Sequence, residues 1–203
     1  MRVALVGATG SAGSRILQEL LSRGHTVLGI ARRIEKLPAM HGVTGQSVDA
    51  NNSAALATAI KGCEALISSV KFKETNTQGL IDAARAAGVQ RYLVVGGAGS
   101  LLLPDGTREM DSPKFPPFVL PEANAGGQFL ELLRTTTDLN WTYISPSRFF
   151  NPGERTGKYQ VGANHLLMDV TGKSAISQED YAIALVDELE NPRHIRQRFT
   201  VGY

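Results

Sequence analysis

Three glycines near the start of the chain have the spacing of a phosphate-binding turn. Gly7, Gly10 and Gly13 stand in GATGSAG, between the apolar run RVALV and a helical pattern. In a strand–turn–helix setting the first glycine turns the chain, the second admits a pyrophosphate and the third lets the helix pack closely. Backbone amides at the helix start then face the anion. The segment predicts dinucleotide binding by the residues Gly7, Thr9, Gly10, Ser11, Ala12 and Gly13, with a purely structural turn as the alternative.

The end of the second predicted strand carries two arginines, Arg32 and Arg33, and no acid. An acidic residue about 20 positions after the glycines accepts hydrogen bonds from the ribose of NAD, whereas an arginine there accommodates the 2′-phosphate of NADP. Guanidinium groups bind phosphate in a bidentate fork. We therefore expect NADPH to be preferred over NADH. Two solvated surface arginines are the alternative.

The third and fourth predicted strands end in further candidate cofactor contacts. Asp49 closes the third strand and either accepts the adenine amino group or caps the helix that begins near Ser53. The fourth strand ends in Ser68, Ser69 and Val70, which we expect along the middle of the cofactor.

The ends of the fifth and sixth predicted strands are expected beside the nicotinamide. Ligands in open α/β sheets lie beyond the carboxyl ends of the strands. The predicted contacts are Gly96, Gly97, Pro146 and Ser147. Ser100 is the first hydroxyl beyond the glycine-rich turn, and Arg148 follows the sixth strand. We take these two as the candidate catalytic residues, Ser100 as a substrate contact and Arg148 as a group that attracts an anionic substrate.

Apolar runs typical of strands alternate with helical patterns along the whole chain. The predicted strands are residues 2–6, 26–31, 45–49, 65–70, 91–96, 141–145 and 198–203, and the last helix runs from about Gln178 to Glu190. Gly24, Gly62 and Gly88 each follow a helical stretch, as left-handed cap residues do. The alternation predicts one α/β domain over residues 1–203, a doubly wound, mostly parallel Rossmann sheet with helices on both faces.

Two stretches interrupt this alternation, at about residues 101–121 and 151–177. The first is rich in proline and the second in glycine and polar residues, and neither has a clear period. Long irregular segments inside compact domains are usually functional or disordered. Because they follow the fifth and sixth strands, we interpret both as loops on the substrate side.

Composition narrows the class of protein further. The 203 residues carry a net charge of +2, with no basic tract and no apolar run long enough for a bilayer, so we expect neither nucleic acid nor membrane as a partner. The single cysteine, Cys63, fits a reducing cytoplasm. The four histidines lack metal-ligand spacing, so no metal site is predicted. The sequence does not determine the oligomeric state, and a homodimer is one expectation.

Longer segments resemble a known family over essentially the whole chain. They are GATGSAG, VVGGAGSLLL, DLNWTYISPSRFFNPGERTGKY and ISQEDYAIALVDELENPRHIRQRFTV. They are similar to the atypical short-chain dehydrogenase/reductases of the NADH-flavin reductase, NmrA-like and biliverdin-IXβ reductase-like group. The resemblance implies a seven-stranded Rossmann sheet that binds NAD(P)H. In the related biliverdin/flavin reductases a histidine stands at roughly the place of Arg148, so the resemblance carries no proton-donor role to that residue.

The sequence departs from ordinary short-chain dehydrogenases in lacking Tyr-x-x-x-Lys, because no tyrosine is followed four positions later by lysine. That pair supplies the proton in carbonyl and alcohol chemistry. A flavin, a quinone or another flat conjugated acceptor delocalises the added charge, so hydride transfer to it needs only close stacking. Phe115, Phe118, Phe149 and Phe150 suit such an acceptor, although aromatics at these spacings are also ordinary core. We therefore expect an NADPH-dependent reductase of a flavin or similar acceptor, with a non-catalytic NADP-binding redox sensor as the alternative.

Overall fold

The central sheet forms where apolar segments alternate with helices along the chain. The computed structural model describes residues 1–203. The sheet strands are β1 (Arg2–Val6), β2 (Thr26–Ala31), β3 (Val43–Ser47), β4 (Ala65–Ser68), β5 (Arg91–Val95), β6 (Asn140–Ser145), β8 (Gln160–Gly162) and β10 (Gln197–Gly202). Their order is β3-β2-β1-β4-β5-β6-β10-β8, and all neighbours are parallel except β10 and β8. The predicted mostly parallel sheet is confirmed, and the antiparallel edge strand β8 adds an eighth strand to the expected seven.

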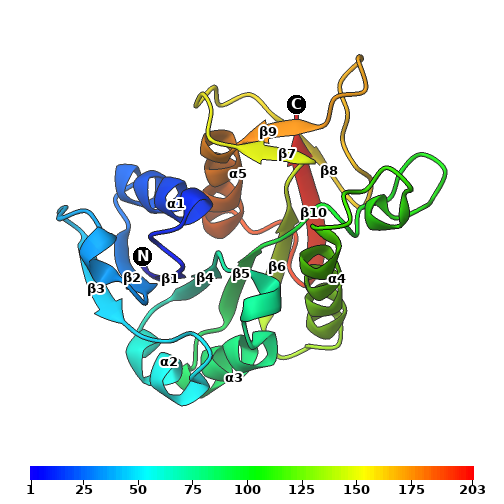
Figure 1. The fold of residues 1–203 in the computed structure, drawn as a ribbon. Coiled ribbons are helices and arrows are strands. Elements are labelled where there is room, and N and C mark those ends of the chain that lie inside the picture. Colours follow the sequence, from blue (N-terminus) through cyan, green and yellow to red (C-terminus); the bar gives the residue numbers. More distant parts are fainter.

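Helices cover both faces of this sheet (Figure 1). One face carries α1 (Ser11–Ser22) and α5 (Gln178–Glu190), and the other carries α2 (Ser53–Ile60), α3 (Thr77–Ala87) and α4 (Leu120–Arg134). Side chains alternate between the faces, so Val3 and Leu5 of β1 pack with the first group of helices while Ala4 and Val6 pack with the second. The doubly wound arrangement is confirmed. None of the five helices has the length and apolarity that a membrane crossing requires.

The three predicted cap glycines adopt left-handed backbone conformations. The φ angles of Gly24, Gly62 and Gly88 are +79°, +79° and +74°. Residues with a Cβ are strained in this region, whereas glycine is not. The ends of the preceding helical segments are therefore fixed by the sequence as predicted.

The strand order reverses between β1 and β4. The chain passes from β1 outward to β2 and β3 and then crosses back to β4 on the other side of β1. The turns after these two strands lie in contact. There is no room for a side chain on Gly7, since an added Cβ would lie 2.0 Å from the carbonyl oxygen of Ser69. Such a reversal leaves a crevice at the carboxyl ends of the strands, where open α/β sheets bind ligands.

The two stretches predicted as irregular contain more structure than expected. Within 151–177 the chain forms β8 and most of a small parallel pair, β7 (Phe149–Asn151) with β9 (Ala175–Ser177). The stretch 101–121 contains a short 3-10 helix, Glu109–Asp111, and the first residues of α4. The irregular interpretation of 151–177 is thus wrong in part. Its strands are three residues long, too short to show a period in the sequence.

Candidate functional site

Two cavities open beside each other over the carboxyl ends of the parallel strands. The first cavity lies over β1, β2 and β4 and includes the predicted residues Gly7, Thr9, Gly10, Arg32, Asp49, Ser69 and Val70. The second cavity lies over β5 and β6 and includes the predicted residues Gly96, Gly97, Ser100, Pro146, Ser147 and Arg148. The remaining predicted residues line neither cavity: Ser11, Ala12, Gly13, Arg33 and Ser68.

The three glycines of the first turn have different reasons to be glycine. Gly7 has a φ of +81° and abuts Ser69. A Cβ on Gly13 would lie 2.1 Å from the carbonyl oxygen of Gly7, so this glycine packs against the turn rather than the strand. Gly10 has an ordinary φ of −74°, and its added Cβ would meet only the Gly7 oxygen, at 3.2 Å. Gly10 lines the first cavity, so the fold itself demands little of this residue, and close approach of a ligand would explain it.

The amino-terminal end of α1 faces the same turn. Its first internal hydrogen bond runs from the amide of Ser14 to the carbonyl of Gly10, which leaves the amides of Ser11, Ala12 and Gly13 outside the helical pattern. No side chain caps this end. The Ser11 hydroxyl instead donates to Gln178 Oε1 at 2.7 Å, so its side chain has no hydrogen left to donate to an anion. Uncapped amides at a helix start favour an anion.

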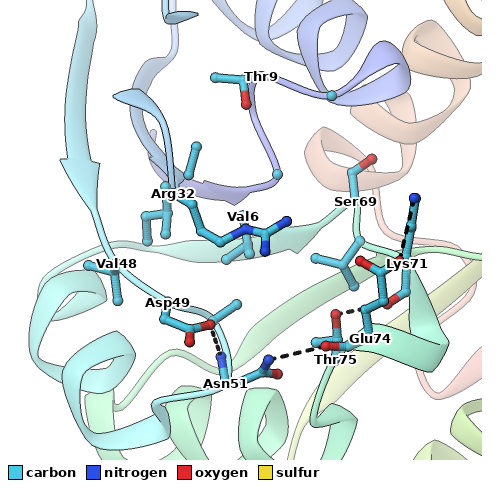
Figure 2. A pocket seen from close by; sticks show the side chains of 16 residues that line it. Val6, Thr9, Arg32, Val48, Asp49, Asn51, Ser69, Lys71, Glu74 and Thr75 are labelled. Carbon is cyan, nitrogen blue, oxygen red and sulfur yellow. Dashed lines mark hydrogen bonds and ion pairs between the residues drawn. The ribbon is translucent and has the colours of Figure 1, made fainter. Parts of the chain in front are cut away.

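The structure separates the two arginines that follow β2. The Arg32 side chain points across the first cavity, between Thr9 on one side and Asp49 on the other (Figure 2). Both arginines are exposed, but Arg33 stands outside the cavity lining. Of the two arginines, only Arg32 is therefore placed to bind a phosphate in this cavity.

Asp49 does not cap the helix that follows it. Asn52 is the cap of α2, because its side chain accepts a hydrogen bond from the amide of Ala55 at 3.0 Å. Asp49 Oδ1 accepts from the amide of Asn51 at 3.0 Å and faces the cavity (Figure 2). The capping alternative is excluded, and the adenine contact stays a prediction.

Ser69 and Ser68 point to opposite sides at the end of β4. Ser69 lines the first cavity, as does Val70. The Ser68 side chain is fully buried, and its oxygen lies 2.8 Å from the Tyr92 hydroxyl. Of the three predicted residues here, Ser68 is thus turned into the core and away from any ligand.

An ion pair that the sequence did not suggest occupies one wall of the second cavity. Arg148 donates from Nε and Nη2 to the two carboxylate oxygens of Glu109, at 2.6 and 2.8 Å. Glu109 is only 5% exposed and also lines this cavity. The carboxylate raises the pKa of the Arg148 guanidinium by hydrogen bonding to its charged form. The charge of Arg148 is therefore already balanced, which weakens the expectation that it attracts an anionic substrate.

Ser100 contacts a second arginine on the side away from the second cavity. Arg198 Nη1 lies 3.2 Å from Ser100 Oγ and donates to it. Because the serine oxygen accepts this bond, its own hydrogen is free to donate into the cavity. Ser147, by contrast, donates its hydroxyl to the carbonyl of Val201 at 3.0 Å, so it offers a ligand little besides backbone.

The tyrosine nearest the second cavity is unsuited to proton transfer. The Tyr143 hydroxyl accepts from the amide of Gly97 and donates to the carbonyl of Gly126, both at 3.1 Å. Burial raises its pKa further above the ordinary range. A ring carbon of Tyr143 would lie 2.3 Å from a Cβ on Gly96, so this tyrosine serves as packing beneath the turn.

The four phenylalanines proposed as substrate contacts divide into two pairs. Phe115 and Phe150 line the second cavity. Phe118 is 86% exposed and Phe149 52% exposed, and neither faces the cavity. Only the first pair is placed to contact a flat acceptor.

Two residues that no sequence pattern indicated also line the cavities, Asn51 the first and Glu122 the second. Glu122 accepts hydrogen bonds from the amides of Phe72 and Lys73 at 2.6 and 3.1 Å, which joins α4 to the turn after β4. Asn51 donates to the carbonyl of Glu74 at 3.1 Å and accepts from the amide of Asn76 at 2.7 Å. Both side chains hold loops in place around the cavities. The one feature of the sequence that could have indicated these two residues is their position at or near the start of a helix.

Comparison with known proteins agrees with this geometry. Residues 7–192 match the sequence profile of a family described as NAD(P)H-binding. The protein YwnB of Bacillus subtilis strain 168, described as uncharacterized, is 39% identical over 214 aligned residues that cover 99% of this chain and 98% of the relative. A structure from Bacteroides thetaiotaomicron, whose name suggests an epimerase, is 39% identical with a TM-score of 0.95 and covers 100% of this chain and 96% of its own. A structure from Streptococcus pneumoniae TIGR4, whose name suggests an NADH-flavin reductase, is 34% identical with a TM-score of 0.86 and covers 100% of this chain and 99% of its own.

Proposed function

The chain belongs to the NAD(P)H-binding family, and we propose that it is an atypical protein of the short-chain dehydrogenase/reductase type, an NADPH-dependent oxidoreductase that transfers hydride to a flavin or similar conjugated acceptor. The observation that carries the proposal is the arrangement of the two cavities. The first contains Gly10 and Arg32, and the second adjoins it over the next strands of the sheet. An extended dinucleotide would have its phosphates in the first cavity and its nicotinamide in the second.

The residues of the first cavity fit the adenosine half of NADPH. The uncapped amides at the start of α1 would bind the pyrophosphate, and Gly10 leaves space for it. Arg32 would bind the 2′-phosphate with its planar guanidinium. Asp49 would accept the adenine amino group with the carboxylate oxygen that the Asn51 amide leaves free.

The second cavity favours an acceptor that needs no protein acid. A bound reduced nicotinamide supplies the hydride. The Tyr143 hydroxyl is held by two backbone partners, and Arg148 is paired with Glu109. Phe115 and Phe150 would hold a flat ring against the nicotinamide, and Ser100 would donate a hydrogen bond to it. Catalysis would then rest on proximity and orientation, with solvent as the final proton source.

The names of the two similar structures suggest different chemistries. The name of the Streptococcus protein agrees with flavin reduction, although it gives NADH rather than NADPH. The name of the Bacteroides protein suggests epimerisation. Isomerisation at a sugar nucleotide would use a free phenol, whereas the tyrosine that lines the second cavity, Tyr143, has its hydroxyl held by two backbone partners, so we prefer the reductase. A reducing cytoplasm and a homodimer stay predictions.

A non-catalytic redox sensor is the second candidate. It is favoured by the exposure of Phe118, at 86%, on the segment that leads into α4 and the second cavity. An exposed aromatic beside a nucleotide site suits a surface whose contact with a partner protein depends on the bound cofactor. In that interpretation NADP binds tightly and no acceptor is reduced.

Anaerobic oxidation of NADPH distinguishes the two candidates. Flavin mononucleotide, riboflavin, quinones and biliverdin would be offered as acceptors, beside a blank without protein and a Gly10→Val variant as the matched control. Reduction of one of these acceptors above both controls supports the reductase. Tight NADPH binding without any reduction favours the sensor instead.

A further inference from the structure

A third cavity lies behind Ser100, between α4 and β10. Its polar lining includes Asn124, Gln128, Asn164 and Arg198. Ser100 and Gly127 line both this cavity and the second one. A Cβ on Gly127 would lie 3.3 Å from Met110 Cε and 3.9 Å from Ser100 Cβ, so these residues form a close-packed wall. The third cavity therefore adjoins the second across Ser100 and Gly127.

Arg198 is buried without a carboxylate partner. It is 8% exposed, and its nearest acceptors are neutral: Asn164 Oδ1 at 2.9 Å, Ser100 Oγ at 3.2 Å, the Ser100 carbonyl at 3.4 Å and Ser145 Oγ at 3.5 Å. The other buried arginine, Arg91, pairs with Glu188 at 3.0 Å. Buried charges in proteins are normally paired, because removing a charge from water is costly. Arg198 departs from that rule.

The other charges around this cavity compensate Arg198 only in part, since Glu131 acts on it at a distance and does not contact it. Arg108 is neutralised by Asp111, at 2.6 and 2.9 Å. Glu131, the carboxylate in the lining, is bound by Arg134 at 2.7 Å. The positive charge of Arg134 also acts on Arg198, and together with the larger effect of burial it lowers the pKa of Arg198 to about 10. Arg198 therefore remains cationic at neutral pH and has no carboxylate within hydrogen-bond distance.

We propose that the third cavity is a binding site for a small oxyanion of the carboxylate or phosphate class, held by Arg198 and Arg134. Arg198 Nη2 makes only one hydrogen bond within the chain, at 3.4 Å, so one of its two N–H groups is left to donate to an anion. Arg134 uses Nη1 for Glu131 and has its remaining N–H groups available. The amides of Asn124 and Gln128 add neutral donors from α4.

An anion bound in the third cavity could affect the second cavity through Arg198 and Ser100. Arg198 donates to Ser100 through both Nη1 and Nη2. An anion that draws the guanidinium toward itself would change these bonds and thereby the orientation of the Ser100 hydroxyl. Binding itself is independent of the proposed reductase activity, since the residues that bind the anion lie behind the wall.

Titration calorimetry on the full chain tests the proposal without any turnover. Sodium phosphate and sodium acetate are the two probes, each against sodium chloride at equal ionic strength. The variants are Arg198→Gln and Arg134→Gln, with Arg85→Gln as the control that removes an exposed arginine elsewhere, and Arg32→Ala to detect binding in the first cavity. Far-ultraviolet circular dichroism checks that each variant is folded. If Arg198→Gln does not fold, Arg134→Gln decides, because its side chain is 48% exposed.

The expected result is saturable binding of at least one probe to the unmodified chain, to Arg85→Gln and to Arg32→Ala. Affinity should fall at least about tenfold in Arg198→Gln, the scale of a lost hydrogen bond to a charged group, and severalfold in Arg134→Gln. Unchanged affinity in both of these variants overturns the proposal. Loss of binding in Arg32→Ala also overturns it, since the anion would then occupy the first cavity, and so does the absence of binding by either probe.

Discussion

Arg148 and Glu109 are joined by two hydrogen bonds in one wall of the second cavity, at 2.6 and 2.8 Å, although 39 positions separate them in the sequence. The pair joins the end of β6 to the segment between β5 and α4. Because Glu109 is buried and Arg148 is partly exposed, the carboxylate depends on the arginine more than the reverse. This ion pair gives the second cavity a fixed wall rather than a free positive charge.

We expect Arg148→Ala to destabilise the protein by about 1–3 kcal/mol, the cost of leaving a buried polar group without its partner. The double variant Arg148→Ala with Glu109→Gln should recover part of this loss, because a neutral amide is cheaper to bury than a charge. Urea unfolding at neutral pH measures both effects. Equal stability of the two variants would show that the carboxylate is not stabilised by the pair.

Gly10 and Gly13 should respond differently to an added side chain. Gly10→Val should abolish NADPH binding and leave far-ultraviolet circular dichroism nearly unchanged, because the chain itself crowds Gly10 only at 3.2 Å. Gly13→Ala should instead lower the free energy of unfolding, by about 1–3 kcal/mol as in other overpacked sites. Normal NADPH binding by a folded Gly10→Val would show that this glycine serves only the turn.

Of the two arginines predicted to bind the 2′-phosphate, only Arg32 lines the first cavity. NADPH should bind more tightly than NADH by about 1–3 kcal/mol, the scale of charge-assisted hydrogen bonds. Arg32→Ala should erase this preference, whereas Arg33→Ala, the matched control, should retain it. Titration calorimetry with both cofactors measures the difference. Equal affinity for the two cofactors in the unmodified protein would contradict the assignment.

The fold was predictable because its features are local in sequence. Five-residue runs such as RVALV and RYLVV are buried on both faces and so read as parallel strands. The turn Gly7–Gly13 was predictable because the spacing of its glycines is itself typical of a strand–turn–helix segment. Strand β8 was missed because Gln160–Gly162 is short and lies at the sheet edge, where no apolar alternation is required.

Residues of the candidate site were predictable only where they come directly after a strand. The Glu109–Arg148 pair needs a tertiary contact that no local pattern records. Arg32 and Arg33 are residues of the same type, and only the structure shows that Arg32 lines the first cavity and Arg33 does not. Likewise Ser68 and Ser69 are neighbours of one type, but one is buried against Tyr92 and the other lines a cavity.

The pH dependence of stability should include a contribution from Asp180. Burial acts to raise the pKa of this carboxyl, but hydrogen bonds from Thr156, Gly157 and Tyr203 outweigh it and lower the pKa below its ordinary value. A lowered folded-state pKa adds stability above the unfolded-state pKa, and this stability is lost as pH falls through the folded-state value. Stability from Asp180 is therefore present at neutral pH and lost in acid, below about pH 4.

Asp180→Asn should lower the free energy of unfolding at pH 7 by about 1.5–3 kcal/mol, the scale of hydrogen bonds to a charged group. It should also flatten the fall in stability between about pH 5 and pH 2. Urea unfolding across this range measures the change, with the exposed Asp82→Asn as control. If the acid-induced fall is as steep in Asp180→Asn as in the unmodified chain, the carboxylate contributes nothing.

The last prediction concerns the chemistry and follows from the second cavity. If hydride passes to a conjugated acceptor with water as the final proton source, no side chain is indispensable. Ser100→Ala should then slow turnover only about tenfold, below the 10²–10⁴-fold typical of a lost general acid. Ser100→Thr keeps the hydroxyl that Arg198 contacts and should retain more activity than Ser100→Ala, which separates the effect of hydrogen bonding from that of packing.

With NADPH deuterated at the transferred position, single-turnover reduction of the acceptor should be slower, because the carbon–hydrogen bond breaks in that step. A loss of more than about a thousandfold in Ser100→Ala would place this serine in an acid or oxyanion role and would contradict solvent-based proton supply.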